Sequence, residues 1–198
     1  GYFQDTATFG STSLTSSGLS DLFITKLDSN GNFLWAKKAG GTNGDNGISI
    51  AVDGSGNSYV TGYFQGTTTF GSSSLTSNGS NDLYITKLAS NGNFLWAKRA
   101  GGTSIDAGFG IAVDGSGNSY VTGSFDGTAT FGSTSLTSYG SSDLYVTKLD
   151  TNGNFLWAIK AGGTGSDSGY GIAVDGSGNS CVTGYYTGTA TFGGLPLT

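Results

Sequence analysis

Short runs of hydrophobic side chains recur along the whole chain and are separated by polar segments rich in glycine. Residues 47–52 alternate large and small side chains, the period of two expected of a strand with two different faces. Residues 58–64 predict a second strand. The segment between them, 53–57, predicts a chain reversal, because its glycines tolerate positive φ and its Asp and Asn can bond to the nearby backbone.

Two more strands follow from the same kind of pattern. Residues 21–27 are apolar on both faces, as in a strand that lies between two neighbours. Asn30-Gly31 predicts a hairpin with a type I′ turn, which needs two residues that accept positive φ. The turn leads into a fourth strand at 32–37, where Trp35 offers a large area for burial.

The pattern repeats with a constant step of 61 residues, since Gly1-Tyr2-Phe3-Gln4 returns in similar form at Gly62, Gly123 and Gly184. The chain is thus one repeat region, 1–198, with units 1–61, 62–122 and 123–183 and a partial unit 184–198. Such a period is typical of proteins in which each unit buries its apolar surface against copies of itself. A polar connection in each unit carries a periodic Phe and Leu, which we expect to pin it to the body of the unit.

Four antiparallel strands per unit predict an all-β fold of tandem four-stranded blades of β-propeller type. With 37 Gly, one Pro, 35% hydrophobic and 13% aromatic residues, the composition favours strands over helices and suffices for a core. The alternatives are an open β-repeat stack or a β-solenoid. Three sets of strands fall short of the roughly four blades of a closed ring, so we expect self-association, a longer array or a filament.

Three motifs carry a family resemblance: Ala-Val-Asp-Gly-Ser-Gly-Asn-Ser-Tyr-Val-Thr-Gly at 51–62, Asn-Phe-Leu-Trp-Ala-Lys at 32–37 and Ala-Gly-Gly-Thr at 39–42. Together with their copies they resemble the SBBP family of β-propeller repeats, in order and spacing and over the whole chain. The resemblance implies a blade-forming module of bacterial surface and secreted proteins, usually without assigned catalysis. It implies no particular ligand.

Charge and hydropathy exclude two classes of partner. Eight Lys and Arg face 13 acidic residues, all of them Asp, and the cations are spread singly, so the electrostatic footprint of a nucleic-acid-binding protein is missing. No stretch approaches the roughly 18 apolar residues of a membrane helix, so we expect no membrane insertion. The chain does not begin with Met, and we expect it to be a mature product or an excised segment.

The residue types argue against an enzyme. Without His and Glu, and with Cys181 as the one cysteine, neither a Ser-His-Asp or Cys-His constellation nor a His-ligated metal site can form. Aspartates in near-identical repeats would share one environment, whereas a general acid and a general base need different ones. Cys181 takes the strand position of Tyr59 and Tyr120 and is expected to be a small apolar substitute there.

Calcium is the one cofactor for which the sequence offers candidates. The Asp-Gly-Ser-Gly-Asn loops resemble the start of a calcium loop but lack its later Glu, and Gly162 to Asp167 matches the opening of a calcium-binding nonapeptide that here is not repeated in tandem. Both are predicted to be turns, so we expect no cofactor. The candidate ligands are Asp53, Asn57, Asp114, Asn118, Asp175, Asn179 and Asp167. Asp45, Asp106 and Asp167 persist while their neighbours vary.

The function expected is that of an extracellular or cell-surface structural, assembly or adhesion module. Its expected partners are other copies of this chain or further repeats of a longer chain. The alternative is a multivalent, lectin-like propeller that binds carbohydrate or protein through Tyr63, Phe64 and Trp35, although core packing is the simpler account of these aromatics. Asn78-Gly79-Ser80 is a glycosylation sequon, so Asn78 is a candidate modification site.

Overall fold

The computed structural model describes all 198 residues, which form strands and turns without a helix. Two complete four-stranded antiparallel blades form, with strands hydrogen-bonded in chain order, and each blade takes its strands from two successive 61-residue units. The first consists of β6 (Asp45–Val52), β7 (Ser58–Phe64), β10 (Asp82–Leu88) and β11 (Phe94–Gly102); the second consists of β12 (Asp106–Val113), β13 (Ser119–Phe125), β16 (Asp143–Leu149) and β17 (Phe155–Gly163). The predicted all-β fold of repeated blades is confirmed.

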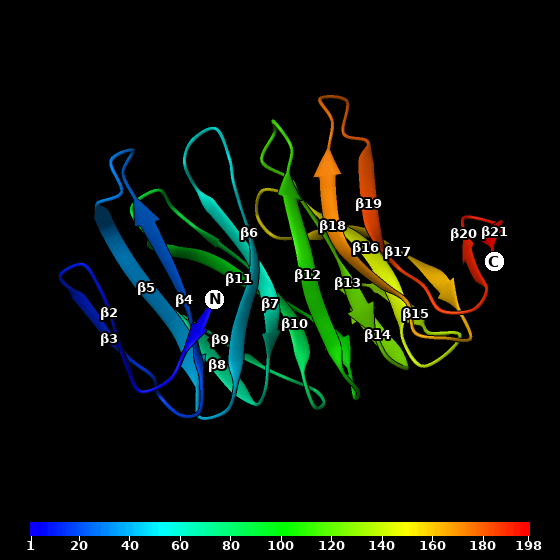
Figure 1. The fold of residues 1–198 in the computed structure, drawn as a ribbon, viewed down its shortest axis with the longest axis horizontal. Helices are drawn as coiled ribbons and strands as arrows, with labels where there is room; N and C mark the ends of the chain where they lie inside the picture. Colours follow the sequence, from blue (N-terminus) through cyan, green and yellow to red (C-terminus); the bar gives the residue numbers. More distant parts are fainter.

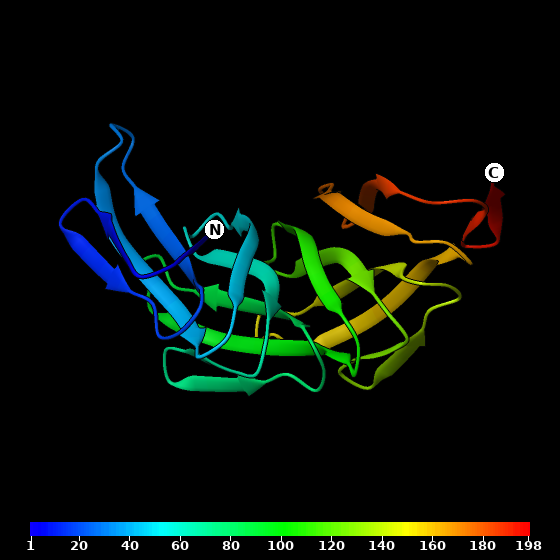
Figure 2. The same cartoon turned by 60° about the horizontal axis from the view of Figure 1, so that its bottom comes forward.

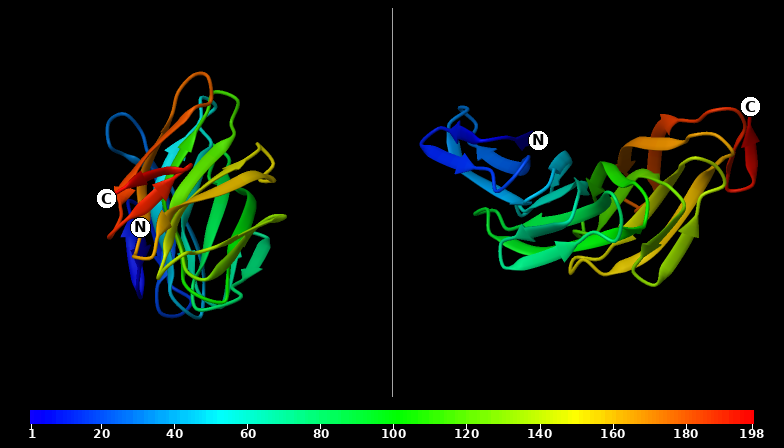
Figure 3. Two further views of the ribbon diagram at one scale, coloured as in Figure 1. Left: turned by 90° about the vertical axis from the view of Figure 1, so that its right-hand side faces the viewer. Right: turned by 90° about the horizontal axis from the view of Figure 1, so that it is seen from below.

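The two ends of the chain hold partial blades. At one end β1 (Tyr2–Phe3), β4 (Asp21–Leu27) and β5 (Phe33–Gly41) lie side by side, and at the other β18 (Ser168–Val174) pairs with β19 (Ser180–Tyr185). The blades follow one another along an open arc, with the C-terminus at one tip and the N-terminus on the inner side of the opposite end (Figure 3). Strands β6, β12 and β18 succeed one another along the inner side of this arc (Figures 1 and 2).

The polar connection of each unit is a β-hairpin. These hairpins are β2 (Thr6–Phe9) with β3 (Thr12–Thr15), β8 (Thr67–Phe70) with β9 (Ser73–Thr76), β14 (Thr128–Phe131) with β15 (Thr134–Thr137), and β20 (Ala190–Phe192) with β21 (Leu195–Leu197). Three of them extend the sheet of the preceding unit, because β8 pairs with β5, β14 with β11 and β20 with β17. The hairpin therefore packs on its own unit, as predicted, through contacts such as that of Phe70 with Tyr84. It is also hydrogen-bonded to the sheet of the preceding unit.

The Asn30-Gly31 hairpin is present, but the predicted type I′ turn is wrong. Gly31 has φ +82°, whereas Asn30 does not have positive φ. The carboxylate of Asp28 explains the difference, since its Oδ1 accepts bonds from the backbone N–H groups of Asn30 and Asn32, each at 2.9 Å. This side-chain bonding holds a tight turn that needs positive φ at the glycine alone. The fourth strand is also longer than predicted, at Phe33–Gly41.

The hydrophobic core lies between neighbouring units. Each of its two main clusters combines side chains from the third and fourth strands of one unit with side chains from the second and third strands and the hairpin of the next. The first cluster contains Leu22, Ile24, Ala39, Val60, Phe64, Phe70, Tyr84 and Leu88. As the period of the sequence predicts, a unit is buried by its neighbours and has no complete core of its own.

Candidate functional site

The joint between successive units, defined here by Gly40, Gly41, Asp45 and Thr68 and their copies, is where the chain interlocks. Gly41 lies opposite Thr68 in the pairing of β5 with β8, and a side chain on Gly41 would collide with the carbonyl of Thr67. The Asp45 carboxylate accepts one bond from the Gly41 N–H at 2.8 Å and another from the Thr68 hydroxyl. One buried side chain thus ties together β5, β6 and β8.

The copies of this joint keep the aspartate but change its partner. Asp106 accepts from the Gly102 N–H and Asp167 from the Gly163 N–H, each at 2.7 Å. The position of Thr68 is taken by Ala129 in the next unit, and Oδ1 of Asp106 has no hydrogen-bond partner. All three aspartates are completely buried. The acids that persist in the sequence are therefore placed at the joints.

Burial makes two of these carboxyl groups, those of Asp45 and Asp106, weaker acids than usual. It raises the pKa of Asp45 to about 6 and that of Asp106 to about 7, because the buried carboxylate loses its hydration. The negative charges of Asp21 and Asp82 add to the respective rises. Hydrogen bonds to the charged form oppose them, and Asp45 has the Thr68 bond that Asp106 lacks. Asp45 and Asp106 therefore titrate closer to neutral pH than an ordinary aspartate does.

A second buried acid begins the third strand of every unit, and sequence reasoning missed it as a candidate. Asp21, Asp82 and Asp143 are completely buried. Each binds a cation located 17 residues later: Lys38 at 2.7 Å, Arg99 at 2.6 Å and Lys160 at 3.2 Å. One oxygen of each carboxylate has no partner. The signal that reveals these pairs is an Asp and a cation at one constant spacing in all three units.

Polar side chains also bridge neighbouring blades at the edge opposite the joints. Trp35 Nε1 donates to the Ser90 carbonyl and Trp96 Nε1 to the Thr151 carbonyl, both at 3.1 Å and both into the next unit. The hydroxyl of Tyr59 donates to the Gly117 carbonyl at 3.0 Å. The Trp side chains are only half-buried. They connect blades more than they fill a core, which the sequence-based interpretation did not foresee.

The calcium candidates in the Asp-Gly-Ser-Gly-Asn loops lie in closed hydrogen-bonded turns. Oδ1 of Asp53 accepts from the N–H groups of Ser55 and Asn57 at 2.9 Å, and its Oδ2 accepts from the Asn57 side chain at 2.8 Å. The loops of Asp114 with Asn118 and of Asp175 with Asn179 repeat these bonds. Asp167 lies in a joint, away from these loops. Nowhere do three Asp or Cys side chains converge on one point.

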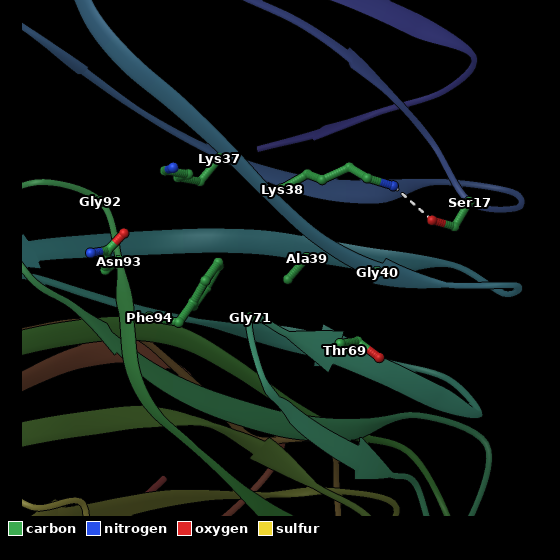
Figure 4. A pocket seen from close by; sticks show the side chains of 10 residues that line it. All are labelled: Ser17, Lys37, Lys38, Ala39, Gly40, Thr69, Gly71, Gly92, Asn93 and Phe94. Carbon is green, nitrogen blue, oxygen red and sulfur yellow. Dashed lines mark hydrogen bonds between the residues drawn. The ribbon is translucent and has the colours of Figure 1, made fainter.

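A cavity of about 570 Å³ opens beside the first joint (Figure 4). Its lining includes Ser17, Lys37, Lys38, Asn93 and Phe94, and Lys38 Nζ donates to Ser17 Oγ at 2.6 Å. The lining residues include two cations and no carboxylate.

The other candidates from the sequence are spread over the molecule. Cys181 is exposed in β19, opposite Ala173. Asn78 is exposed in the loop before β10, and its backbone N–H donates to Asp82 at 3.0 Å. Phe64 is fully buried and cannot stack on a sugar, whereas Tyr63 is half-buried.

A row of large apolar side chains that are exposed or half-buried, the inner stripe, runs across β6, β12 and β18. It consists of Ile48, Ile50, Phe109 and Tyr170, with Tyr185 of β19 beside it. Tyr170 is 54% exposed, and its ring lies 5.4 Å from that of Phe109 and 5.6 Å from that of Tyr185. Sequence reasoning did not identify this surface, because strand alternation alone cannot tell which face another sheet covers.

Comparison with curated proteins finds two relatives of similar identity. The chain is 31% identical over 199 residues to the uncharacterized WD repeat-containing protein L264 of Acanthamoeba polyphaga mimivirus, and 30% identical over 168 residues to the regulatory protein FlaEY of Caulobacter vibrioides. These alignments include 84% and 81% of this chain. The chain spans only 14% and 18% of the relatives' own lengths.

Among solved structures, the crystal structure of a protein of unknown function from Bacteroides caccae matches with a TM-score of 0.44 and 15% identity, covering 90% of this chain and 52% of that one. None of the chain is helical, so it contains no helix suited to crossing a membrane.

Residues 34–63 and 95–127 match the SBBP β-propeller repeat. Each matched segment runs from the fourth strand of one unit through the joint into the second strand of the next. The chain is thereby identified as one that carries SBBP β-propeller repeats.

Proposed function

We propose that this chain is a non-enzymatic structural and assembly module of the bacterial cell surface or extracellular space, built to hold blades in a fixed arc. The observation that supports it best is the interlocking of the units. Each hairpin after the first belongs to one unit by sequence and to the preceding unit by its pairing. Neighbouring blades therefore cannot separate without breaking strand pairing, which suits a module that carries mechanical load or spaces other domains.

The proposal is tested by asking whether the blades unfold as one. In Gly102→Val, the new side chain would collide with the Thr128 carbonyl and break the pairing of β11 with β14. We expect urea unfolding of the native chain in a single transition and of the variant in two, because the joint no longer couples the units. Gly115→Ala is the matched control, since a methyl group there meets no atom within 4 Å. Independent unfolding of the native blades would contradict the proposed role.

The proposed location has its own test. Cells that produce the protein are treated with an amine reagent that does not cross membranes, followed by mass spectrometry of the labelled lysines. Labelling without cell lysis is expected for a surface protein, and a cytoplasmic marker protein serves as the control. Labelling that appears only after lysis would contradict the extracellular assignment while leaving the interlocked scaffold in place.

The inner stripe favours a second candidate function, binding of protein or carbohydrate to the concave side of the arc. Its aromatic members Phe109 and Tyr170 take the repeat position of Ile48; Tyr170 is exposed and Phe109 is half-buried. Exposed aromatic clusters are common in recognition surfaces. A glycan array and a screen of surface-protein extracts would test it. Binding lost in Tyr170→Ser and kept in Tyr139→Ser, a change at a 69% exposed tyrosine outside the stripe, would support this candidate over a purely structural role.

A further inference from the structure

The last unit exposes half of a core that the interior of the chain completes. A groove of about 760 Å³ lies between the second complete blade and β19, and Leu144, Val146, Ala161, Val182, Tyr186 and Phe192 line its floor and walls. The same repeat positions in the first cluster are Leu22, Ile24, Ala39, Val60, Phe64 and Phe70. There they are covered by Tyr84 and Leu88.

Side chains in the groove are more exposed than the side chains at the same repeat positions in the interior. Val182 and Tyr186 are each 38% exposed, whereas Val60 and Phe64 are 3% and 0% exposed at the same repeat positions. The missing elements are an aromatic side chain and a leucine from a third strand. In this repeat those two side chains lie four residues apart, like Tyr84 and Leu88.

The other end of the arc carries those two side chains. In β4, Phe23 and Leu27 stand at the repeat positions of Tyr84 and Leu88. Leu27 is 44% exposed, while Leu88 is fully buried. Phe23 is half-buried under Phe9 at 4.8 Å between ring centroids, just as Tyr84 lies under Phe70 at 5.0 Å.

Resting on the assembly role proposed above, we propose that β4 of a second copy of this chain docks beside β19 and fills the groove with Phe23 and Leu27. The result is a composite blade in the order β18-β19-β4-β5, with two strands from each copy. This contact is head-to-tail, and it continues an interface that the chain itself already forms twice.

Backbone groups at both edges are free to make the contact. β1 pairs with β4 only at Leu22 and Asp21, which leaves the edge of β4 open from Ile24 to Leu27. β19 pairs on one side with β18 and is open on the other. The register of β7 with β10 carries over directly, because Thr61 lies opposite Ile85 and Ser58 opposite Leu88. In the composite blade Thr183 then faces Ile24, and Ser180 faces Leu27.

Docking requires one terminal segment to leave. Residues 1–15 of the incoming copy and residues 184–198 of the receiving copy occupy the same repeat positions. Strands β2 and β3 form an isolated two-stranded sheet, which is marginally stable, whereas β20 is bonded to β17 at Gly162 and Gly163. Residues 1–15 are therefore the segment displaced, and Phe192 of the receiving copy replaces Phe9 against Phe23. Until a second copy arrives, residues 1–15 act as a cover over the docking strand.

The test blocks each edge separately. Phe23 N donates to Gly1 O at 3.1 Å, so Thr25, two residues later, also directs its N–H to the open edge. Val182 is its counterpart on β19, two residues before Gly184, the copy of Gly1. Thr25→Pro and Val182→Pro remove these donors and leave the backbone bonds to the inner neighbours β5 and β18 in place. Thr25→Pro also loses the bond that the Thr25 hydroxyl donates to the Trp35 carbonyl at 2.9 Å, and the control Thr25→Val loses the same bond. Thr25→Val and Val182→Thr are the matched controls that keep the N–H.

We expect the native chain and both controls to associate in sedimentation equilibrium, and each proline variant to lose at least about tenfold in association constant. A mixture of the two proline variants is expected to form a 1:1 complex, because each supplies the edge that the other lacks. Phe9→Ser, which weakens the cover, is expected to tighten association of the full chain roughly tenfold.

Two results would overturn the docking. One is a native chain and a Phe9→Ser variant that both remain monomeric up to about 1 mM, which would assign the groove to a blade from elsewhere in a longer polypeptide. The other is an oligomer that persists unchanged in both proline variants. Neither result touches the single unfolding transition expected of interlocked blades, so failure of the docking and failure of the proposed scaffold role are distinguished.

Discussion

The interior interface and the two edges of the arc contain nearly the same residues at the same repeat positions, yet the side chains at these positions differ in how deeply they are buried. Tyr145 is fully buried between units and donates its hydroxyl to the Ala107 carbonyl at 3.2 Å, while Phe23, at the same repeat position, is half-buried under a short hairpin. The difference teaches that burial is set by the number of neighbours a unit has, and not by its own sequence. Stability in this chain is therefore a property of pairs of units.

The largest effect tests this difference directly. Tyr145→Ala removes a fully buried aromatic ring and leaves a cavity, so we expect the free energy of unfolding to fall by about 4 kcal/mol. Phe23→Ala at the edge is expected to cost about 1 kcal/mol, because its ring is only half-buried. Both are measured by urea unfolding at low protein concentration. Equal losses at the two positions would show that the edge is as well packed as the interior.

The next effect concerns the free energy that it costs to bury the charged Asp106 carboxylate in an interior joint. The native-state pKa of Asp106, about 7, lies above the ordinary value of 3.8, so the folded state binds a proton that the unfolded state releases. Its contribution to stability is fully present below about pH 4 and is lost as the pH rises through 7. Asp106→Asn keeps an acceptor for the Gly102 N–H without the buried charge. We expect the variant to be more stable than the native chain at pH 8 by about 2 kcal/mol.

The pH dependence supplies the control for that comparison. Asp150 is an exposed turn residue whose pKa is lowered by hydrogen bonds from the backbone and the side chain of Asn154. A depressed pKa has the opposite sign, so the stability it contributes is present at neutral pH and is lost on acidification below about pH 4. Asp150→Asn should leave the profile between pH 5 and 8 unchanged in shape. If Asp106→Asn shows the native slope in that range, the charge of Asp106 is not the cause of the slope.

A smaller effect compares two interior joints with each other. Thr68 donates its hydroxyl to Asp45, and Ala129 leaves Oδ1 of Asp106 without a partner. Ala129→Thr is expected to stabilise the chain by about 1 kcal/mol at pH 8 and to lower the pKa of Asp106, because the new bond favours the charged carboxylate. Thr68→Ala should do the reverse at Asp45. Carboxyl chemical shifts followed through a pH titration measure both changes.

The blade, its strand order and its period were predictable because strand alternation and turn residues act locally. The second strand at Ser58–Phe64 and the third at Asp21–Leu27 have the predicted bounds. The destination of the hairpin was not predictable, since Thr67–Phe70 pairs with a strand more than 25 residues earlier and nothing in its alternation names that partner. Only some of the buried acids could be recognised from the sequence. Asp45 stood out because it recurs in every unit, whereas Asp21, whose charge acts on Asp45, was not recognised because it begins a strand.

The smallest effect isolates a single hydrogen bond between blades. Trp96 donates to the Thr151 carbonyl of the next unit at 3.1 Å, whereas Trp157 has the same ring contact, 6.1 Å from a tyrosine, and makes no hydrogen bond through its N–H. Trp96→Phe is expected to cost about 0.5 kcal/mol more than Trp157→Phe, since both lose similar area and only the first loses a bond. A thermal unfolding series of the two variants measures the difference. Equal costs would mean that the indole bond contributes nothing to holding the blades together, and that strand pairing and the buried aromatics alone couple one unit to the next.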